Sequence, residues 1–216
     1  MSLKAQIIMS KKEYQQKVIN EFTPFSEYYD EYAENGKEIN GCILKYYSVS
    51  SLIDLIRETK SLQSTTSILD LGTGTALFAE ALKKIKSDIK VTGVDLTTEM
   101  LRKAANKNIL DEILCADLTH RFPFKDNSFD MTTISSVFEF LNGYYKHTVD
   151  EMIRVTKPKG VIAIAAKKSD ELNIHDYLNN KNNLEVISSK FSPGYIITKN
   201  GNSQETPYEY IIARVN

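Results

Sequence analysis

The stretch Ser67–Leu82, SILDLGTGTALFAEAL, decides the fold. An apolar run ends at Asp70 and Leu71, two glycines follow one residue apart, and apolar residues then recur at helical spacing. This pattern is typical of a buried strand, a tight loop and the start of a helix. Gly72 permits the unusual dihedrals of such a loop, and Gly74 leaves room for a ligand against the main chain. The pattern therefore predicts a ligand site beyond the end of this strand.

Four further apolar runs follow the first, with helical patterns between them. Strands that alternate with helices indicate a mostly parallel sheet with helices on its faces. We therefore expect an α/β fold with a Rossmann-like, doubly wound sheet of seven strands. The end of the chain predicts a closing hairpin with an antiparallel C-terminal strand. The first five expected strands span residues 67–71, 89–95, 112–117, 129–136 and 160–166.

The N-terminal part of the chain has a different character. Residues 1–62 are rich in tyrosine and patterned like helices, so they predict a helical N-terminal extension that acts as a lid. Residues 63–216 then form the ligand-binding domain. Tyr28, Tyr29 and Tyr32 are candidates for contact with a bound substrate, and the alternative is that they only complete a helical core.

Composition excludes several classes of partner. The 216 residues are 42% hydrophobic and 25% charged with a net charge of −1, so no basic bias favours nucleic acid. No apolar run has the length of a membrane span, and no signal peptide is expected at the start. Cys42 and Cys115 are predicted to be free thiols in a reducing cytoplasm, and no Cys/His cluster suggests a metal. We expect a cytoplasmic monomer or homodimer whose partner is a small molecule.

The residues around the glycine loop discriminate between nucleotide ligands. A dinucleotide fingerprint requires a third glycine where this chain has Leu77. Asp70 would repel a pyrophosphate, whereas it would attract an amine. S-adenosylmethionine fits this loop better, because it carries an α-amino group, a ribose and an adenine but no phosphate. Asp95 lies 21 residues after Gly74, close to the offset of about 20 expected for a ribose-binding acid.

At this point LDLGTGTA (69–76) resembles the first motif of the class I S-adenosylmethionine-dependent methyltransferases. Residues 91–101, 115–141 and 153–166 resemble the later segments of that family, in the same order. The similarity is greatest to the small-molecule subfamily that includes ubiquinone and menaquinone biosynthesis methyltransferases. It implies an enzyme that transfers a methyl group from S-adenosylmethionine to a small, partly apolar acceptor and releases S-adenosylhomocysteine.

The resemblance also implies a role for each motif residue. Asp70 lies by the amine of the cofactor, and Asp95 accepts both ribose hydroxyls. Asp117 accepts from the adenine amino group, and Ser135 borders the methyl group. The other implied contacts are by packing: Gly72 and Gly74 under the methionine and ribose, Leu96 against adenine, and Leu118 beside its ring. From the residues alone, Asp95 is also compatible with a helix cap and Asp117 with a solvated loop carboxylate.

The chain departs from the family pattern at informative positions. The third glycine of the loop is Ala76, and Lys159 stands where the family has a glycine. The leucine-glutamate-histidine often found after the fourth strand reads Phe138-Glu139-Phe140, so the base role of that histidine has no counterpart here. Phe138 and Glu139 stay candidates for the acceptor side of the site, and no catalytic residue is assigned.

Two other functions remain open at this stage. One is a nicotinamide-dependent oxidoreductase, which Asp70 and Leu77 disfavour. The other is a non-catalytic module that binds S-adenosylmethionine. The identity of the acceptor, and whether oxygen, nitrogen or carbon receives the methyl group, do not follow from the sequence.

Overall fold

The computed structural model describes residues 11–216 except 37, 40–41, 142 and 170–171. Helices and strands follow one another along the chain in this order: α1 Lys11–Phe25, α2 Tyr29–Asn35, β1 Glu38–Ile39, β2 Cys42–Tyr46, α3 Ser48–Glu58, β3 Ser67–Leu71, α4 Leu77–Ile85, β4 Lys90–Asp95, α5 Thr98–Asn106, β5 Glu112–Cys115, β6 Phe129–Ser135, the 3₁₀ turn η1 Phe138–Phe140, α6 Tyr145–Val155, β7 Thr156–Lys167, α7 Ile174–Asn179, β8 Leu184–Lys199 and β9 Asn202–Val215.

The strands form one sheet in the order β1-β2-β8-β9-β7-β6-β3-β4-β5. The five strands from β3 to β7 pair in parallel, and β9 runs antiparallel to both β7 and β8. The expected α/β sheet with an antiparallel C-terminal strand is confirmed. The chain winds from β3 through β4 to β5 and then returns to the other side of β3 with β6. This reversal places a crevice at the carboxyl ends of β3, β4 and β6.

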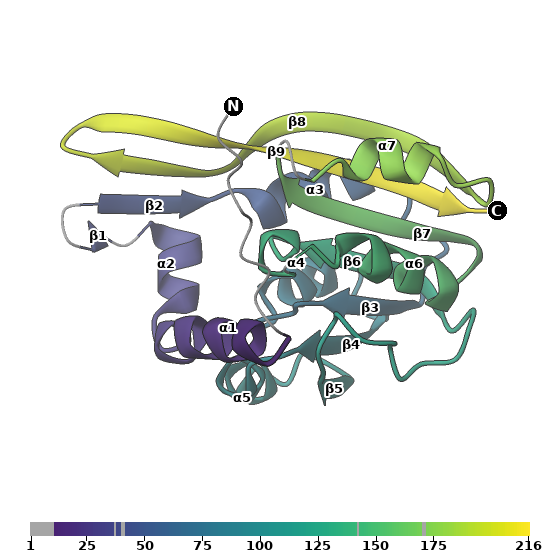
Figure 1. Cartoon of the computed structure of the whole chain (residues 1–216), viewed down its shortest axis with the longest axis horizontal. Coiled ribbons are helices and arrows are strands. Elements are labelled where there is room, and N and C mark those ends of the chain that lie inside the picture. The colour runs from purple at the N-terminus through teal and green to yellow at the C-terminus, as the bar shows by residue number, and fades with distance from the viewer. Residues whose placement is uncertain (1–10, 37, 40–41, 142, 170–171) are drawn as a thin grey trace, which may run out of the picture.

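Both faces of the sheet are covered by helices, as Figure 1 shows for α6 and α7 on the viewer's side. Side chains of β7 alternate between two cores: Ile162 and Ile164 pack with α6 and α7, whereas Val161 and Ala163 pack with α3 and α4. A strand buried on both faces reads as a continuous apolar run, and this is why GVIAIAA was recognisable in the sequence.

The N-terminal segment corrects one expectation, because it is not all helical. Strand β2 pairs antiparallel with β8, with Leu44 opposite Ile197, and β1 pairs with β2. The seven expected strands are present, and these two additions make nine. The exposed edge of β8 offers unpaired backbone groups that β2 satisfies. The division at residue 62 stays a prediction, and the sheet extends across it.

The C-terminal strands are also longer than the sequence indicates. Strands β8 and β9 form a hairpin that extends past the rest of the sheet, with β2 beside it (Figure 1). Pro193 and Gly194 lie in a bulge within β8, not in a loop between two short strands. Gly194 is required there because a Cβ atom would lie 2.1 Å from the Tyr208 ring.

Candidate functional site

The glycine loop connects β3 to α4 with three left-handed residues, Gly72, Gly74 and Ala76. A Cβ atom on Gly72 would lie 2.3 Å from Val137, so a side chain is excluded there. Around Gly74 the nearest atom to such a Cβ is Tyr29 Cε1 at 4.0 Å, so its backbone faces open space. Ala76 takes the left-handed conformation at φ 69°, which costs a residue with a Cβ about 1–2 kcal/mol.

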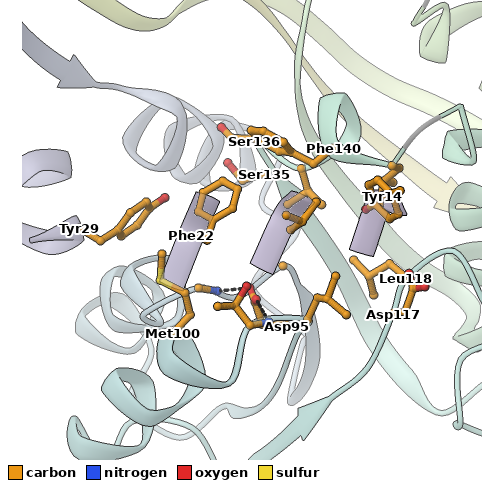
Figure 2. A pocket seen from close by; sticks show the side chains of 17 residues that line it. Tyr14, Phe22, Tyr29, Asp95, Met100, Asp117, Leu118, Ser135, Ser136 and Phe140 are labelled. Carbon is orange, nitrogen blue, oxygen red and sulfur yellow. Dashed lines mark hydrogen bonds between the residues drawn. The ribbon is translucent and has the colours of Figure 1, made fainter. Parts of the chain in front are cut away.

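A cavity lies against this loop, between α1 and the carboxyl ends of β3, β4 and β6 (Figure 2). We call it the first cavity. Among its lining residues are Tyr29 and seven strand-end or loop residues that the sequence also singles out: Gly72, Gly74, Asp95, Leu96, Asp117, Leu118 and Ser135. Figure 2 shows Tyr29 at one end of the cavity and Asp117 at the other, with Asp95 between them. The topology therefore brings together residues that come from four separate strand ends.

Asp95 ends β4 and binds the loops on both sides of it. Its Oδ2 accepts a hydrogen bond from the Gly74 amide at 2.9 Å, and its Oδ1 accepts one from the Thr97 amide at 2.8 Å. Burial raises the pKa of this carboxyl despite these donors. The N-cap residue of α5 is Thr97 and the helix has no side-chain cap, so Asp95 holds the turn before the helix while it also lines the cavity. Since a carboxylate has about four acceptor positions, Asp95 can still receive further donors from a ligand.

Asp117 follows β5 and is not a solvated loop residue. It accepts hydrogen bonds from the Thr119 amide at 2.8 Å and from Gln15 Nε2 of α1 at 2.7 Å. Partial burial raises the pKa of this carboxyl, but these donors outweigh burial and the net pKa is lowered. His120 Nδ1 lies 3.0 Å from Asp117 Oδ2, and its side chain is exposed. Asp117 is therefore an ionised acceptor at one end of the cavity.

Asp70 lies deeper, at the end of β3. It contributes to a second cavity, which we define by Asp70, Tyr46, Val49 and Phe78, and which shares Gly72, Gly74, Tyr29 and Ser135 with the first. The Thr73 hydroxyl donates to Asp70 at 2.7 Å and the Thr133 hydroxyl at 2.8 Å. Burial still raises the pKa of Asp70 to about 6. This carboxyl lacks a cationic partner among the described residues that it contacts, so a cationic ligand group would stabilise its ionised form.

The shared wall of the two cavities carries two further polar groups. The hydroxyl of Ser135, at the end of β6, is buried and has no hydrogen-bond partner among the described residues. An unpaired buried hydroxyl at a cavity wall is a group that a ligand can satisfy. Opposite it, burial raises the pKa of Tyr29 to about 12, with contributions from the charges of Asp95, Asp30 and Glu139. Tyr29 is therefore a neutral hydroxyl among carboxylates.

Helix α1, part of the predicted N-terminal lid, supplies a wall of the first cavity that includes Tyr14 and Val18, two residues that sequence reasoning did not single out. Tyr14, Val18 and Phe22 line the first cavity from this helix. Their spacing of four residues places them along one face of a helix, and this periodicity was the available signal. Burial and the nearby charges of Asp117 and Asp95 raise the pKa of the Tyr14 hydroxyl well above its usual range. The helix thus closes the cavity over the carboxylates of the sheet.

Polar contacts fasten α1 and α2 to the rest of the site. Glu27 forms ion pairs with Lys103 at 2.8 Å and Arg102 at 3.3 Å on α5. Asp30 binds the Thr75 hydroxyl of the glycine loop and lies 2.7 Å from Lys107. The N-terminal segment is therefore held over the cavity by polar contacts with the α5 region and the glycine loop, as well as by the packing of Tyr14, Val18 and Phe22.

Several predicted acceptor-side residues lie elsewhere. Tyr28 is 42% exposed and packs its ring edge-on against Phe25, so it lines neither cavity. Phe138 is 1% exposed and points into the core beneath the turn after β6. Glu139 is exposed, lines neither cavity and accepts a hydrogen bond from Tyr208. The side chains of Tyr32 and Cys42 lie outside the described residues, and Cys115 is an exposed free thiol.

Comparison with known sequences agrees with this geometry. The family described as "Methyltransferase domain" matches residues 69–164, from the glycine loop to β7. A malonyl-[acyl-carrier protein] O-methyltransferase of Buchnera aphidicola is 34% identical over 99 residues, which cover 46% of this chain and 38% of that protein. A demethylmenaquinone methyltransferase of Thermotoga maritima is 34% identical over 97 residues, which cover 45% of this chain and 42% of that protein. The chain thus spans about two fifths of the length of these curated relatives.

Solved structures extend the similarity to nearly the whole chain. Magnesium protoporphyrin IX methyltransferase (ChlM) from Synechocystis PCC 6803, solved with bound SAM, superposes with a TM-score of 0.64 over 98% of this chain and 100% of that one, at 11% identity. The [4+2]-cyclase SpnF superposes with a TM-score of 0.68 over 93% of this chain and 96% of that one, at 15% sequence identity. At these identities the likeness defines the fold alone.

The fold and the comparisons agree on the proteins that this chain resembles. The sheet is the Rossmann-like sheet of the methyltransferases, and residues 69–164 match a methyltransferase domain. The resemblance to class I S-adenosylmethionine-dependent methyltransferases, with small-molecule relatives, is confirmed.

Proposed function

We propose that this protein is an S-adenosylmethionine-dependent methyltransferase that acts on a small, partly apolar molecule by in-line methyl transfer. The observation that supports this most strongly is the set of three carboxylates along the two adjoining cavities at the glycine loop, with Asp95 and Asp117 in the first cavity and Asp70 in the second. Their spacing over separate strand ends suits a ligand with an amine, a ribose diol and an adenine. A ligand with a pyrophosphate would meet like charges instead.

The residues present fit this cofactor. Asp95 would accept from the ribose hydroxyls, while Asp117 and Leu118 would hold the adenine. Asp70 would face the amine from the second cavity, and the open backbone at Gly74 would lie under the ligand. When bound, the cofactor supplies a methyl group already activated by a sulfonium.

The chain's own contribution is to orient the acceptor and exclude water. Tyr14, Val18 and Phe22 cover the cavity with apolar surface, and Tyr29 closes the end near Ser135. Holding two reactants in line is worth several kcal/mol of a barrier, about 7–11 kcal/mol at best, so a methyltransferase does not require a strong general base for every acceptor. We assign no catalytic base within this proposal.

The nicotinamide oxidoreductase is the weaker candidate. Leu77 stands where close packing of the dinucleotide fold requires a glycine, and Asp70 is buried at the strand end where a pyrophosphate would pass. A non-catalytic or differently catalytic binding module is a second alternative, since a protein named a cyclase has the same fold. The fold by itself therefore does not identify the reaction.

Two measurements separate these functions. Isothermal calorimetry should show binding of S-adenosylmethionine and S-adenosylhomocysteine and none of NADH. Incubation of metabolite extracts with methyl-labelled cofactor should then yield a labelled small molecule. Tight NADH binding without a response to S-adenosylhomocysteine would reverse the assignment, and cofactor binding without any labelled product would favour the non-catalytic module.

No described helix is long and apolar enough to cross a membrane. A small-molecule acceptor, a cytoplasmic location and a monomeric or homodimeric state remain predictions of the sequence within this proposal. Size-exclusion chromatography with light scattering measures the oligomeric state directly.

A further inference from the structure

The turn after β6 carries a carboxylate that the proposed cofactor contacts do not use. Glu139 Oε1 accepts a hydrogen bond at 3.0 Å from the hydroxyl of Tyr208, a residue of β9. Tyr208 is 1% exposed, so its hydroxyl is fixed by packing and fixes the carboxylate in turn. Glu139 itself is solvent-exposed, yet the protein atoms around it desolvate its carboxyl and raise its pKa. The Glu139 carboxylate is therefore held at one oxygen by Tyr208 and belongs to an exposed residue.

The turn that carries Glu139 borders the first cavity. Ser136, Val137 and Phe140, the neighbours of Glu139 in the turn, line the first cavity. Tyr29 lines both cavities, and the charge of Glu139 contributes to the raised pKa of its hydroxyl. Glu139 therefore lies close enough to Tyr29, which lines both cavities, for its charge to affect that hydroxyl.

Four tyrosine rings continue from these cavities to the carboxylate. The centroids of Tyr29 and Tyr46 are 6.4 Å apart, those of Tyr46 and Tyr195 5.7 Å, and those of Tyr195 and Tyr208 6.0 Å. Aromatic faces attract ammonium groups as well as apolar surface. The row of rings thus suits a molecule that is partly apolar and carries a positive or hydrogen-bond-donating group.

Among the described residues, the charged side chains that line the two cavities are all acidic. Among the described lining residues of the two cavities there is no lysine, arginine or histidine, whereas Asp70, Asp95 and Asp117 are present. Lys167, whose charge acts on Glu139, belongs to neither lining. An acceptor with a carboxylate or phosphate would enter a field of like charge, while an amine would find partners.

We propose that the acceptor's reactive group is an amine nitrogen and that Glu139, positioned by Tyr208, receives its N–H. This rests on the proposed methyltransferase function. An amine that enters as ammonium first loses one proton through the Glu139 carboxylate to water, which frees the nitrogen lone pair. When this lone pair bonds to the methyl carbon, the carbon–sulfur bond breaks and its electron pair stays on sulfur. The nitrogen is then a cation that must release one proton, and the Glu139 carboxylate is in position to take that proton and pass it to water.

The test uses two probes of matched shape, 2-phenylethylamine and 3-phenylpropionate. Calorimetric titration of each into the complex of the full chain with S-adenosylhomocysteine at pH 8 reports binding without requiring turnover. We expect the amine to bind at least about tenfold more tightly than the acid, a difference of about 1.4 kcal/mol. Equal binding, preference for the acid, or binding of neither probe would overturn the proposal.

Substitutions test which residue causes the preference for the amine probe. Glu139→Gln should reduce amine affinity at least about tenfold and leave S-adenosylhomocysteine affinity unchanged, because only the acceptor side is altered. Tyr208→Phe keeps the buried ring and should reduce amine affinity less, again without changing S-adenosylhomocysteine affinity. Glu205→Gln on the exposed part of β9 is the matched control and should change neither.

Unchanged amine affinity in Glu139→Gln would remove Glu139 from the acceptor site. The proposed function fails separately, since it is overturned if S-adenosylhomocysteine itself does not bind the unaltered chain.

Discussion

At the scale of single residues, Asp95 carries two tasks at once. It holds the Gly74 and Thr97 amides and, in the proposed function, the ribose hydroxyls. Hydrogen bonds to a charged group are worth about 1.5–3 kcal/mol each. We therefore expect Asp95→Ala to weaken S-adenosylhomocysteine binding by more than about tenfold, measured by calorimetry.

The control for this prediction is Asp88→Ala, because Asp88 is an exposed acid away from both cavities. Circular dichroism should show that both variants are folded. A folded Asp95→Ala variant with an unchanged dissociation constant would contradict the ribose role.

Asp70 predicts a pH-dependent stability of the ligand-free protein. Its pKa is about 6 in the fold against 3.8 as the ordinary value, because burial disfavours its charge. The folded state therefore retains a proton between these values, and the protein loses stability as pH rises through this window. Asp70→Asn removes the charge, so it should stabilise the protein at pH 8 by up to about 3 kcal/mol and have little effect near pH 4.

Thermal melts of the ligand-free protein at both pH values measure this difference. The same variant should bind S-adenosylhomocysteine more weakly at pH 8, because the ligand amine loses a charged partner. An equal shift in melting temperature at pH 4 and pH 8 would contradict the assignment of the burial cost to the Asp70 charge.

At the scale of elements, α1 and the turn beyond it act as one cover fastened to α5. Reversing the charge of Glu27 turns two attractions, to Lys103 and Arg102, into repulsions. Exposed pairs are individually weak, so we expect Glu27→Lys to speed S-adenosylhomocysteine dissociation by roughly two- to fivefold at low salt, and less at high salt. Stopped-flow displacement measures this rate.

Glu21→Lys is the matched control for the cover, since Glu21 is an exposed residue of α1, the helix that precedes the Glu27 turn. It should leave the dissociation rate unchanged. If both variants alter the rate equally, the effect reflects net charge and not the contact with α5.

At the scale of the whole molecule, the N-terminal segment belongs to two structures. Its helices cover the first cavity, and its strand β2 extends the sheet beside β8. Deleting residues 1–40 removes α1, α2 and β1 but leaves β2. We expect methyl transfer to be lost, because water reaches the methyl group, while weakened cofactor binding remains measurable.

A thermal melt of the truncated chain establishes whether it folds. Full methyl transfer by a folded truncation would show that the cover is dispensable, whereas an unfolded truncation would mean that these helices are part of the core. Labelled methyl transfer and calorimetry on the same sample distinguish these results.

The sequence by itself determined the parallel strands from β3 to β7, the glycine loop and the acids at the strand ends. These follow from local patterns. A strand that is covered on both faces is a continuous apolar run. The loop before the helix needs a left-handed backbone at position 72, and glycine adopts that conformation most easily. Chain order then places Asp95 and Asp117 beside the loop, because carboxyl ends of parallel strands share one edge of the sheet.

Only the tertiary structure decided which distant surfaces meet. Glu139 and Tyr208 are 69 residues apart and join because β9 inserts between β7 and β8. Gln15 reaches Asp117 across 102 residues, and Tyr28 turns to solvent while Tyr29 turns to the cavity. Local patterns specify which face of an element is apolar, but the partner of that face depends on packing and loop closure over the whole chain.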